Sequence, residues 1–172
     1  MPNPVTTPGR TNVPNPAGDY APGEQRPLAA YAVLTGAFFA ALAGAGVAAR
    51  AQRREIERPS LPDVVLHGLA TQKASRLIAK DKVTSFLRAP FTRYQEPAGH
   101  GELEEAPRGD GLRYAIGELL VCPYCIAQWV AGGLAVGHVF APRATRLLSA
   151  MWATQAIADG VQLTYSGAKQ QT

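Results

Sequence analysis

Residues 28–49 form a run of 22 residues without a charged side chain. At about 1.5 Å per residue, a helix of this length spans roughly 33 Å, which matches a bilayer hydrocarbon core of about 30 Å. Arg50, Arg53 and Arg54 follow the run immediately. Because the arginines come after the apolar run and not before it, the pattern favours an uncleaved membrane anchor over a cleaved signal peptide.

Two later segments are also apolar enough to predict membrane helices. The first predicted transmembrane helix covers residues 115–140, and the second covers residues 144–165 and contains one carboxylate, Asp159. Residues 61–79 mix aliphatic and basic side chains, so this helix either lies amphipathically in the interface or spans as a fourth helix. The sequence therefore predicts an all-α integral membrane protein with three clear transmembrane helices and this additional helix.

The remaining segments are polar. Residues 1–26 contain six prolines and only two aliphatic anchors, which predicts a disordered tail. Residues 27–60 then form the anchor with a basic linker, and residues 61–168 form a helical membrane domain. Within that domain, residues 80–113 are charged and rich in proline and glycine, which predicts a solvent-exposed polar loop.

The positions of lysine and arginine predict an orientation in the membrane, because cytoplasmic segments are enriched in both. With three spans, 13 basic residues lie on the side of residues 50–113 and four lie on the other side. With four spans the split is only nine to six. Charge therefore favours three spans in the bacterial cytoplasmic membrane, with the N-terminus outside and the C-terminus in the cytoplasm, whereas hydrophobic length permits four.

The basic excess, 17 Lys and Arg against 13 Asp and Glu, indicates a lipid partner. No interleaved basic and aromatic pattern suggests nucleic acid, so we expect no nucleic-acid partner. Lys80, Lys82, Arg88 and Arg93 alternate with apolar residues and are candidates for contact with anionic headgroups, with a solvated loop as the alternative.

One face of the first apolar segment carries only small residues. Gly36, Ala40, Gly44 and Ala48 recur every four residues, a spacing that allows close contact between helices. This face predicts a homo-oligomer or another membrane protein as partner. A chance ladder in an alanine-rich helix is the alternative.

The sequence Cys122-Pro123-Tyr124-Cys125 is the sharpest local motif. These four residues match a glutaredoxin active site, but the strand and βαβ context of that fold is absent. A helix over 123–140 would place Cys122 at its cap, and a reducing cytoplasm argues against a resting disulfide. Packing, redox and metal roles remain open. A zinc site would need two more ligands, from His67, His100 or a second protomer.

Four polar side chains are candidates for an intramembrane cluster, because a carboxylate within a span usually faces a partner or a water-filled cavity. They are Arg76, Glu118, Gln128 and Asp159. The cluster either holds the helices together or forms a proton or solute site.

An ordered set of motifs gives the chain a family resemblance. The motifs are Leu69-Ala70-Thr71, Ser75-Arg76-Leu77, Lys80-Asp81-Lys82-Val83-Thr84, Leu87-Arg88-Ala89-Pro90-Phe91, Gly117-Glu118-Leu119-Leu120, the cysteine motif and Trp129. Over residues 63–165 the chain resembles the bacterial membrane family known as domain of unknown function thirteen-sixty, of which some members carry a sporulation label. The resemblance implies a small multi-span protein with a CxxC at a membrane helix, and it implies no established reaction.

These observations predict a non-enzymatic membrane protein, for example an assembly, scaffold or envelope component, with no cofactor. The alternative is a membrane thiol–disulfide oxidoreductase, or a metal-binding protein, that uses Cys122 and Cys125. The chain has no second cysteine pair to relay electrons, which counts against an enzyme.

Overall fold

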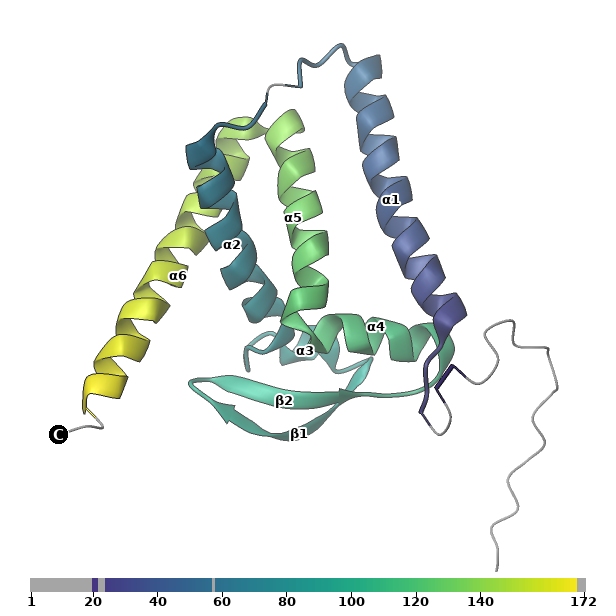
Figure 1. Cartoon of the computed structure of the whole chain (residues 1–172), viewed down its shortest axis with the longest axis vertical. Helices are drawn as coiled ribbons and strands as arrows, with labels where there is room; N and C mark the ends of the chain where they lie inside the picture. The colour runs from purple at the N-terminus through teal and green to yellow at the C-terminus, as the bar shows by residue number, and fades with distance from the viewer. Residues whose placement is uncertain (1–19, 22–23, 57, 170–172) are drawn as a thin grey trace, which may run out of the picture.

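The computed structural model describes residues 20–21, 24–56 and 58–169, and Figure 1 shows long helices that stand above a small platform. The four long helices are α1 (Leu28–Ala51), α2 (Leu61–Ala79), α5 (Pro123–Phe140) and α6 (Pro142–Lys169). The platform consists of α3 (Ser85–Arg88), β1 (Thr92–Gly99), β2 (Glu102–Pro107) and α4 (Gly111–Val121). The fold is therefore mostly helical, and the predicted all-α class is corrected by a β-hairpin.

The four long helices alternate in direction. α1 runs away from the platform, α2 returns to it, and α5 and α6 repeat this path, so the start of α1 and the end of α6 both lie at the platform end (Figure 1). The sequence predicted that the two termini lie on opposite sides of the membrane, which follows from three crossing helices and not from four. Because α2 stands beside α5 and α6 as a fourth, the structure does not place the two ends apart.

The helix predicted over residues 61–79 is confirmed, and its start has a local cause. Ser60 and Asp63 form a reciprocal capping box, in which the Ser60 hydroxyl accepts from the Asp63 backbone N–H and the Asp63 carboxylate accepts from the Ser60 backbone N–H. Ala70 and Ala74, one turn apart, are buried on one face of α2, and Ala79 is buried at its end. These small side chains let α2 pack closely between its neighbours.

The transmembrane helix predicted over 115–140 is instead broken into α4 and α5, whose axes differ by 86°. Cys122 between them has an extended backbone (φ −102°, ψ 104°). Pro123, which lacks an amide hydrogen, then opens α5. An α-helix cannot continue through this pair, so α4 lies across the platform while α5 stands upright. The predicted helix over 123–140 with Cys122 at its cap is confirmed.

The predicted solvent loop over residues 80–113 is wrong, because most of this segment is structured. β1 and β2 pair as an antiparallel hairpin with two register irregularities. Three ion pairs join basic residues from α2 and the segment after it to acidic residues of β2: Arg76–Glu102, Lys80–Glu104 and Arg88–Glu105. The hairpin is therefore held by long-range charge pairing rather than by an apolar strand pattern.

Arg88 is the centre of the platform and is 0% exposed. Its guanidinium pairs with Glu105 and donates to the carbonyl oxygens of Ile78 (2.7 Å) and Asp81 (3.0 Å). These contacts tie the end of α2 to β2. The prediction that Arg88 contacts lipid headgroups is therefore wrong, since a side chain without exposed surface cannot reach a headgroup.

Most of the predicted disordered tail, residues 1–26, lies outside the described residues. The end of that segment is ordered against the platform: the Gln25 side chain donates to Gly109 O (3.2 Å) and to Asp110 Oδ1 (3.1 Å). For residues 24–26 the tail prediction is therefore wrong.

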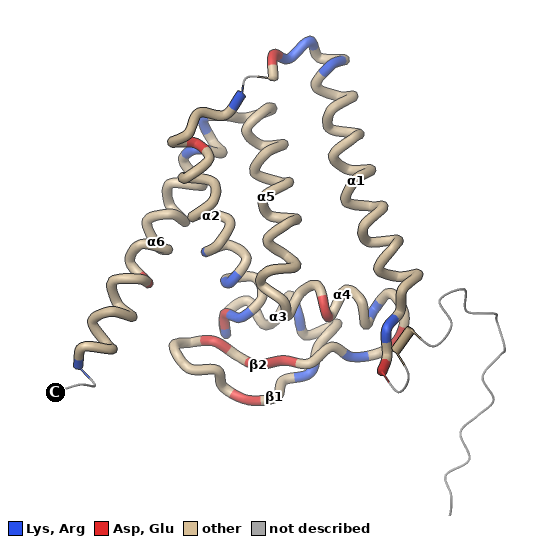
Figure 2. The backbone as a smooth tube through the Cα atoms, in the orientation of Figure 1, with Lys and Arg blue, Asp and Glu red and all other residues tan. Residues whose placement is uncertain are grey.

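By length and composition, α1 is the one described helix that could span a membrane by itself. The bent pair α4 and α5 passes the same test only when it is counted as one segment. Figure 2 shows that charged residues gather at the platform and in the α1–α2 connection, whereas the middle of α1 and α5 has none. The predicted three or four spans are thus reduced to one clear candidate.

Candidate functional site

The cysteine motif lies where α4 meets α5. Cys122 caps α5, and its sulfur accepts a hydrogen bond from the Cys125 backbone N–H at 3.2 Å. A sulfur in this position faces the partial positive charge of a helix N-terminus, which favours the thiolate. Cys125 and Tyr124 are exposed and Cys122 is partly exposed. The motif is therefore accessible from outside the described fold.

The structure joins Cys122 and Cys125 by a disulfide, with their Cα atoms 5.2 Å apart. The sequence placed these residues in a reducing cytoplasm and therefore predicted a reduced resting pair, whereas the structure has the disulfide. The local arrangement can in principle carry two-electron thiol–disulfide exchange.

A mixed polar and apolar pocket of about 520 Å³ adjoins the cysteine motif between α1, α4 and α5. Cys125, Glu118 and Gln128 line it together with apolar residues that include Phe38 and Trp129. Glu118 accepts a short hydrogen bond from the Tyr31 hydroxyl. It also lies 3.7 Å from the Arg26 guanidinium.

Arg26 has a second acidic neighbour at the mouth of this pocket. The Glu24 carboxylate accepts hydrogen bonds from the Arg26 guanidinium and raises the pKa of Arg26. Arg26 is therefore a fixed positive charge at this entrance.

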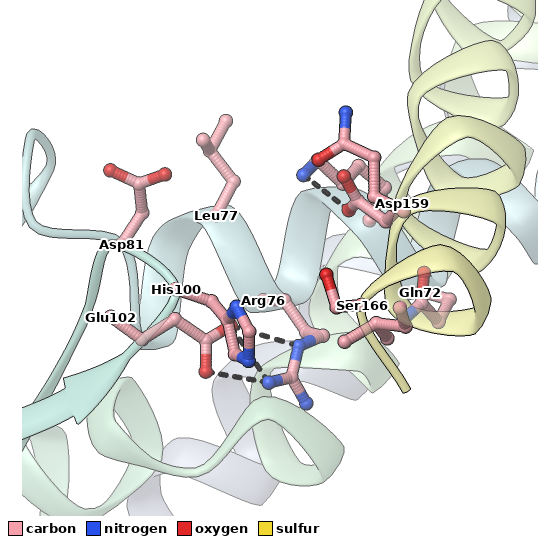
Figure 3. A pocket seen from close by; sticks show the side chains of 11 residues that line it. Gln72, Arg76, Leu77, Asp81, His100, Glu102, Asp159 and Ser166 are labelled. Carbon is pink, nitrogen blue, oxygen red and sulfur yellow. Dashed lines mark hydrogen bonds and ion pairs between the residues drawn. The ribbon is translucent and has the colours of Figure 1, made fainter. Parts of the chain in front are cut away.

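A charged pocket of about 340 Å³ lies between α2, α6 and the hairpin turn (Figure 3). The Lys73 ammonium contacts the Asp159 carboxylate at 2.6 Å. The Arg76 guanidinium donates to both carboxylate oxygens of Glu102, at 2.6 and 2.7 Å. Each of these four charges has an opposite partner, and the carboxylate of Asp81, which accepts from the Val83 backbone N–H, also lines the pocket.

The predicted cluster of Arg76, Glu118, Gln128 and Asp159 is divided by the structure. Arg76 and Asp159 line the charged pocket, whereas Glu118 and Gln128 line the pocket beside the cysteines. Each charged member pairs with a residue that sequence reasoning did not assign to the cluster. The sequence did not indicate these partners because they are distant along the chain: 26 residues from Arg76, 86 from Asp159 and 87 from Glu118.

The remaining lipid-surface candidates are also divided. Lys82 and Arg93 are exposed, as are Val83 and Phe86 of the same region, whereas Lys80 is largely covered by its pairing with Glu104. Two of the four basic side chains are therefore free to meet a surface outside the chain.

The suggested metal ligands do not gather at the cysteines. Among the described residues, the cysteine pair belongs to no group of three or more histidine, cysteine or carboxylate ligands, and His100 lines the charged pocket instead. His67 lies against His138, with His67 Nε2 and His138 Nδ1 3.1 Å apart. The zinc site expected at Cys122 and Cys125 therefore has no third or fourth ligand nearby among the described residues.

Together, the fold and these sites define a small, mostly helical protein with one clear candidate membrane helix, an accessible cysteine motif at a helix break, a charged pocket and a mixed polar and apolar pocket. The chain belongs to the family described as Protein of unknown function (DUF1360), whose model matches residues 66–165. This finding confirms the resemblance noted from the sequence motifs.

Two relatives from Bacillus subtilis (strain 168) are similar to this chain. Sporulation protein YjcA is 31% identical over 106 residues, which cover 60% of this chain and 90% of YjcA. UPF0713 protein YngL is 30% identical over 91 residues, which cover 51% of this chain and 66% of YngL. No solved structure matches the chain significantly.

Proposed function

We propose that the chain is a non-enzymatic component of a bacterial membrane assembly. In this proposal α1, the one described helix apolar enough to span alone, crosses the bilayer, and α2, α5 and α6 cross beside it with the platform at one surface. The observation that supports this proposal is that large apolar side chains on the long helices are exposed on the outside of the chain. They include Val33, Phe39 and Val47 on α1, Val64 and Val65 on α2, and Met151, Ile157, Val161 and Leu163 on α6. Side chains of this kind need an apolar environment outside the chain.

The charge distribution supports the same placement. The platform end and the α1–α2 connection hold most of the charges (Figure 2), as expected for segments in water or at headgroups. Four crossings put nine basic residues on the platform side and six on the other side. We therefore assign the platform, the start of α1 and the end of α6 to the cytoplasmic side. The exposed Lys82 and Arg93 are well placed there to meet anionic headgroups.

A component of an assembly needs a surface that contacts its partner, and one face of α1 is a candidate for this surface. A Cβ atom added at Gly36 or Gly44 would meet nothing within 4 Å, so this face of α1 has no partner among the residues that the structure describes. A second copy of the chain, approaching through Gly36, Ala40 and Gly44, fits this face because small residues permit close helix contact.

Two measurements on the full chain in bacterial cells test this function. The chain should stay in the membrane pellet after an alkaline carbonate wash, and release into the supernatant would contradict membrane insertion. In a C122S/C125S background, Gly44→Cys should form a covalent dimer on mild oxidation. Phe39→Cys, an exposed position on a different face of α1, is the matched control and should not. Equal yields from both variants would argue against a contact through this face.

A second candidate function is thiol–disulfide exchange, which the capping geometry of Cys122 favours. A partner dithiol would pass two electrons and two protons to the Cys122–Cys125 disulfide and leave as its own disulfide. In this case Cys125→Ser should trap a mixed disulfide through Cys122 in cells, because the resolving thiol is missing. Absence of any trapped species with either single variant would exclude exchange as the main role.

A further inference from the structure

Three potential metal ligands from α2 and α5 meet at the end of the molecule away from the platform. Asp63, His67 and His138 each present a ligand atom, and these atoms all lie within 4.8 Å of one another. Asp63 and His67 are four residues apart on α2, so they share one helix face. His138 comes from the last turn of α5. No other group of three such ligands occurs within the part of the chain that the structure describes.

His67 is oriented by a buried hydroxyl. Its Nδ1 atom lies 2.9 Å from Oγ of Ser149, a residue of α6 that is completely buried. When Nδ1–H donates to this oxygen, the lone pair of Nε2 points toward His138. Metal-binding histidines are commonly fixed in this way through their second ring nitrogen.

The spacing of the two imidazoles suits one shared ion. His67 Nε2 and His138 Nδ1 are 3.1 Å apart. Two nitrogens that are each roughly 2.0–2.1 Å from a tetrahedral zinc ion lie about 3.3 Å from one another. The observed spacing therefore needs only a small adjustment. A direct hydrogen bond between the two rings fits the same distance and is the competing account.

Asp63 is the third ligand of the set, and because the three ligand atoms lie within 4.8 Å of one another, its carboxylate must move toward the imidazoles to share an ion with them. Its Oδ2 atom accepts from the Ser60 hydroxyl, the Ser60 backbone N–H and Arg146 Nη2, whereas Oδ1 accepts from Arg146 Nε at 2.9 Å. An oxygen with one hydrogen bond keeps a lone pair for an ion. Because Arg146 already balances the Asp63 charge, the two neutral imidazoles would provide most of the affinity.

An open side leads to the pair of histidines. His67 and His138 line a cavity of about 490 Å³ whose other walls are mainly apolar, including Val64, Ala135 and Val139. The cavity gives an ion a path of entry and leaves room for a water molecule at a fourth coordination position.

We propose that Asp63, His67 and His138 form a binding site for a late first-row divalent cation, with Zn²⁺ or Co²⁺ as suitable probes. Two imidazoles and one carboxylate form a ligand set that such ions use, with the remaining position open to water. This site is distinct from the cysteine pair and from the assembly contact on α1, so it stands or falls independently of the proposed function.

The test measures Zn²⁺ binding to the full chain in detergent, after chelator treatment, in the C122S/C125S background and with a purification tag that contains no histidine. The proposal predicts one Zn²⁺ per chain. His67→Ala and His138→Ala should each weaken binding at least tenfold. His100→Ala is the matched control, since the chain has three histidines and this one lies at the hairpin turn, and it should bind as the parent does.

Stability provides the second measurement if an alanine variant folds poorly. Zn²⁺ should raise the melting temperature of the parent chain and of His100→Ala, but not that of His138→Asn, which keeps a polar group beside His67. Absence of Zn²⁺ binding to the parent chain would overturn the proposal in favour of a simple histidine–histidine hydrogen bond. So would binding that survives in both His67→Ala and His138→Ala.

Discussion

α1 and α2 follow one another in the chain, but they bury different kinds of residue. α2 turns its small and polar residues inward, including Asp63, Ala74 and Ser75, and leaves Val64 and Val65 exposed. α1 is more apolar, yet it buries only Ala30, Phe38 and Ala49. The hydrophobicity of a segment therefore does not say how much of it packs inside the chain. In α1 most apolar surface remains for an environment or a partner outside, whereas in α2 close packing depends on small residues.

The largest expected effect concerns the attachment of α2 to the platform. Arg88→Ala leaves Glu105 buried without its partner and frees two backbone carbonyls at the end of α2. Breaking a buried ion pair costs about 3–5 kcal/mol. The free energy of unfolding in detergent should fall by this amount, or the chain should fail to fold. Lys82→Ala, at an exposed position nearby, is the control. Equal stability of the two variants would refute the structural role of Arg88.

A smaller effect is expected within α1 itself. Phe38 is 8% exposed and contacts Trp129 edge to face, whereas the adjacent Phe39 is 61% exposed. Phe38→Ala should lower the free energy of unfolding by about 2–3 kcal/mol, because it removes a buried aromatic ring. Phe39→Ala should change it by less than about 0.5 kcal/mol. A comparable loss in both variants would mean that α1 packs on a different face.

Replacing an alanine by a larger side chain should affect the stability of the chain differently in α2 and in α1. Ala70 of α2 is 0% exposed, and Ala70→Leu should cost about 1–3 kcal/mol because no space exists for the larger side chain. Ala40 of α1 is exposed, so Ala40→Leu should leave the fold of the single chain unchanged. Thermal unfolding of both variants in detergent tests this contrast. Tolerance of leucine at position 70 would show that α2 is not closely packed.

The smallest effect is expected for Asp159→Asn. Asp159 pairs with Lys73, but its side chain is 47% exposed and lines the charged pocket beside the hairpin turn, so we expect water in this pocket to screen the pair. The loss should be below about 1 kcal/mol, in the range of surface ion pairs. Glu96→Gln, at an exposed position of β1, is the control. A loss of several kcal/mol measured by denaturant unfolding would show that the pair is effectively buried.

Local signals in the sequence were sufficient for α2 and α5. The apolar and basic mixture over residues 61–79 predicted a helix, and Ser60 and Asp63 supply a capping signal that agrees with its start. Pro123 fixed the start of α5 in the same way. The right-angle break was missed because hydropathy alone joins α4 to α5.

The hairpin was missed for a different reason. Its strands contain Pro97 and a run of acidic residues instead of alternating apolar side chains, and its position depends on ion pairs with residues many positions away. The matching series of basic residues in 76–88 and acidic residues in 102–105 was the one available signal. The meeting of His67 and His138 could not be predicted from spacing, since the facing of α2 and α5 is a property of the tertiary fold.

Cysteine accessibility in intact bacterial cells tests the four-helix crossing most directly. In the C122S/C125S background, Gln52→Cys lies in the α1–α2 connection and Gln95→Cys lies in the hairpin, both at exposed positions at opposite ends of the molecule. A membrane-impermeant maleimide should label position 52 alone in intact cells, and both positions after permeabilisation. Labelling of both positions, or of neither, in intact cells would place them on one side of the membrane and contradict the four-helix crossing.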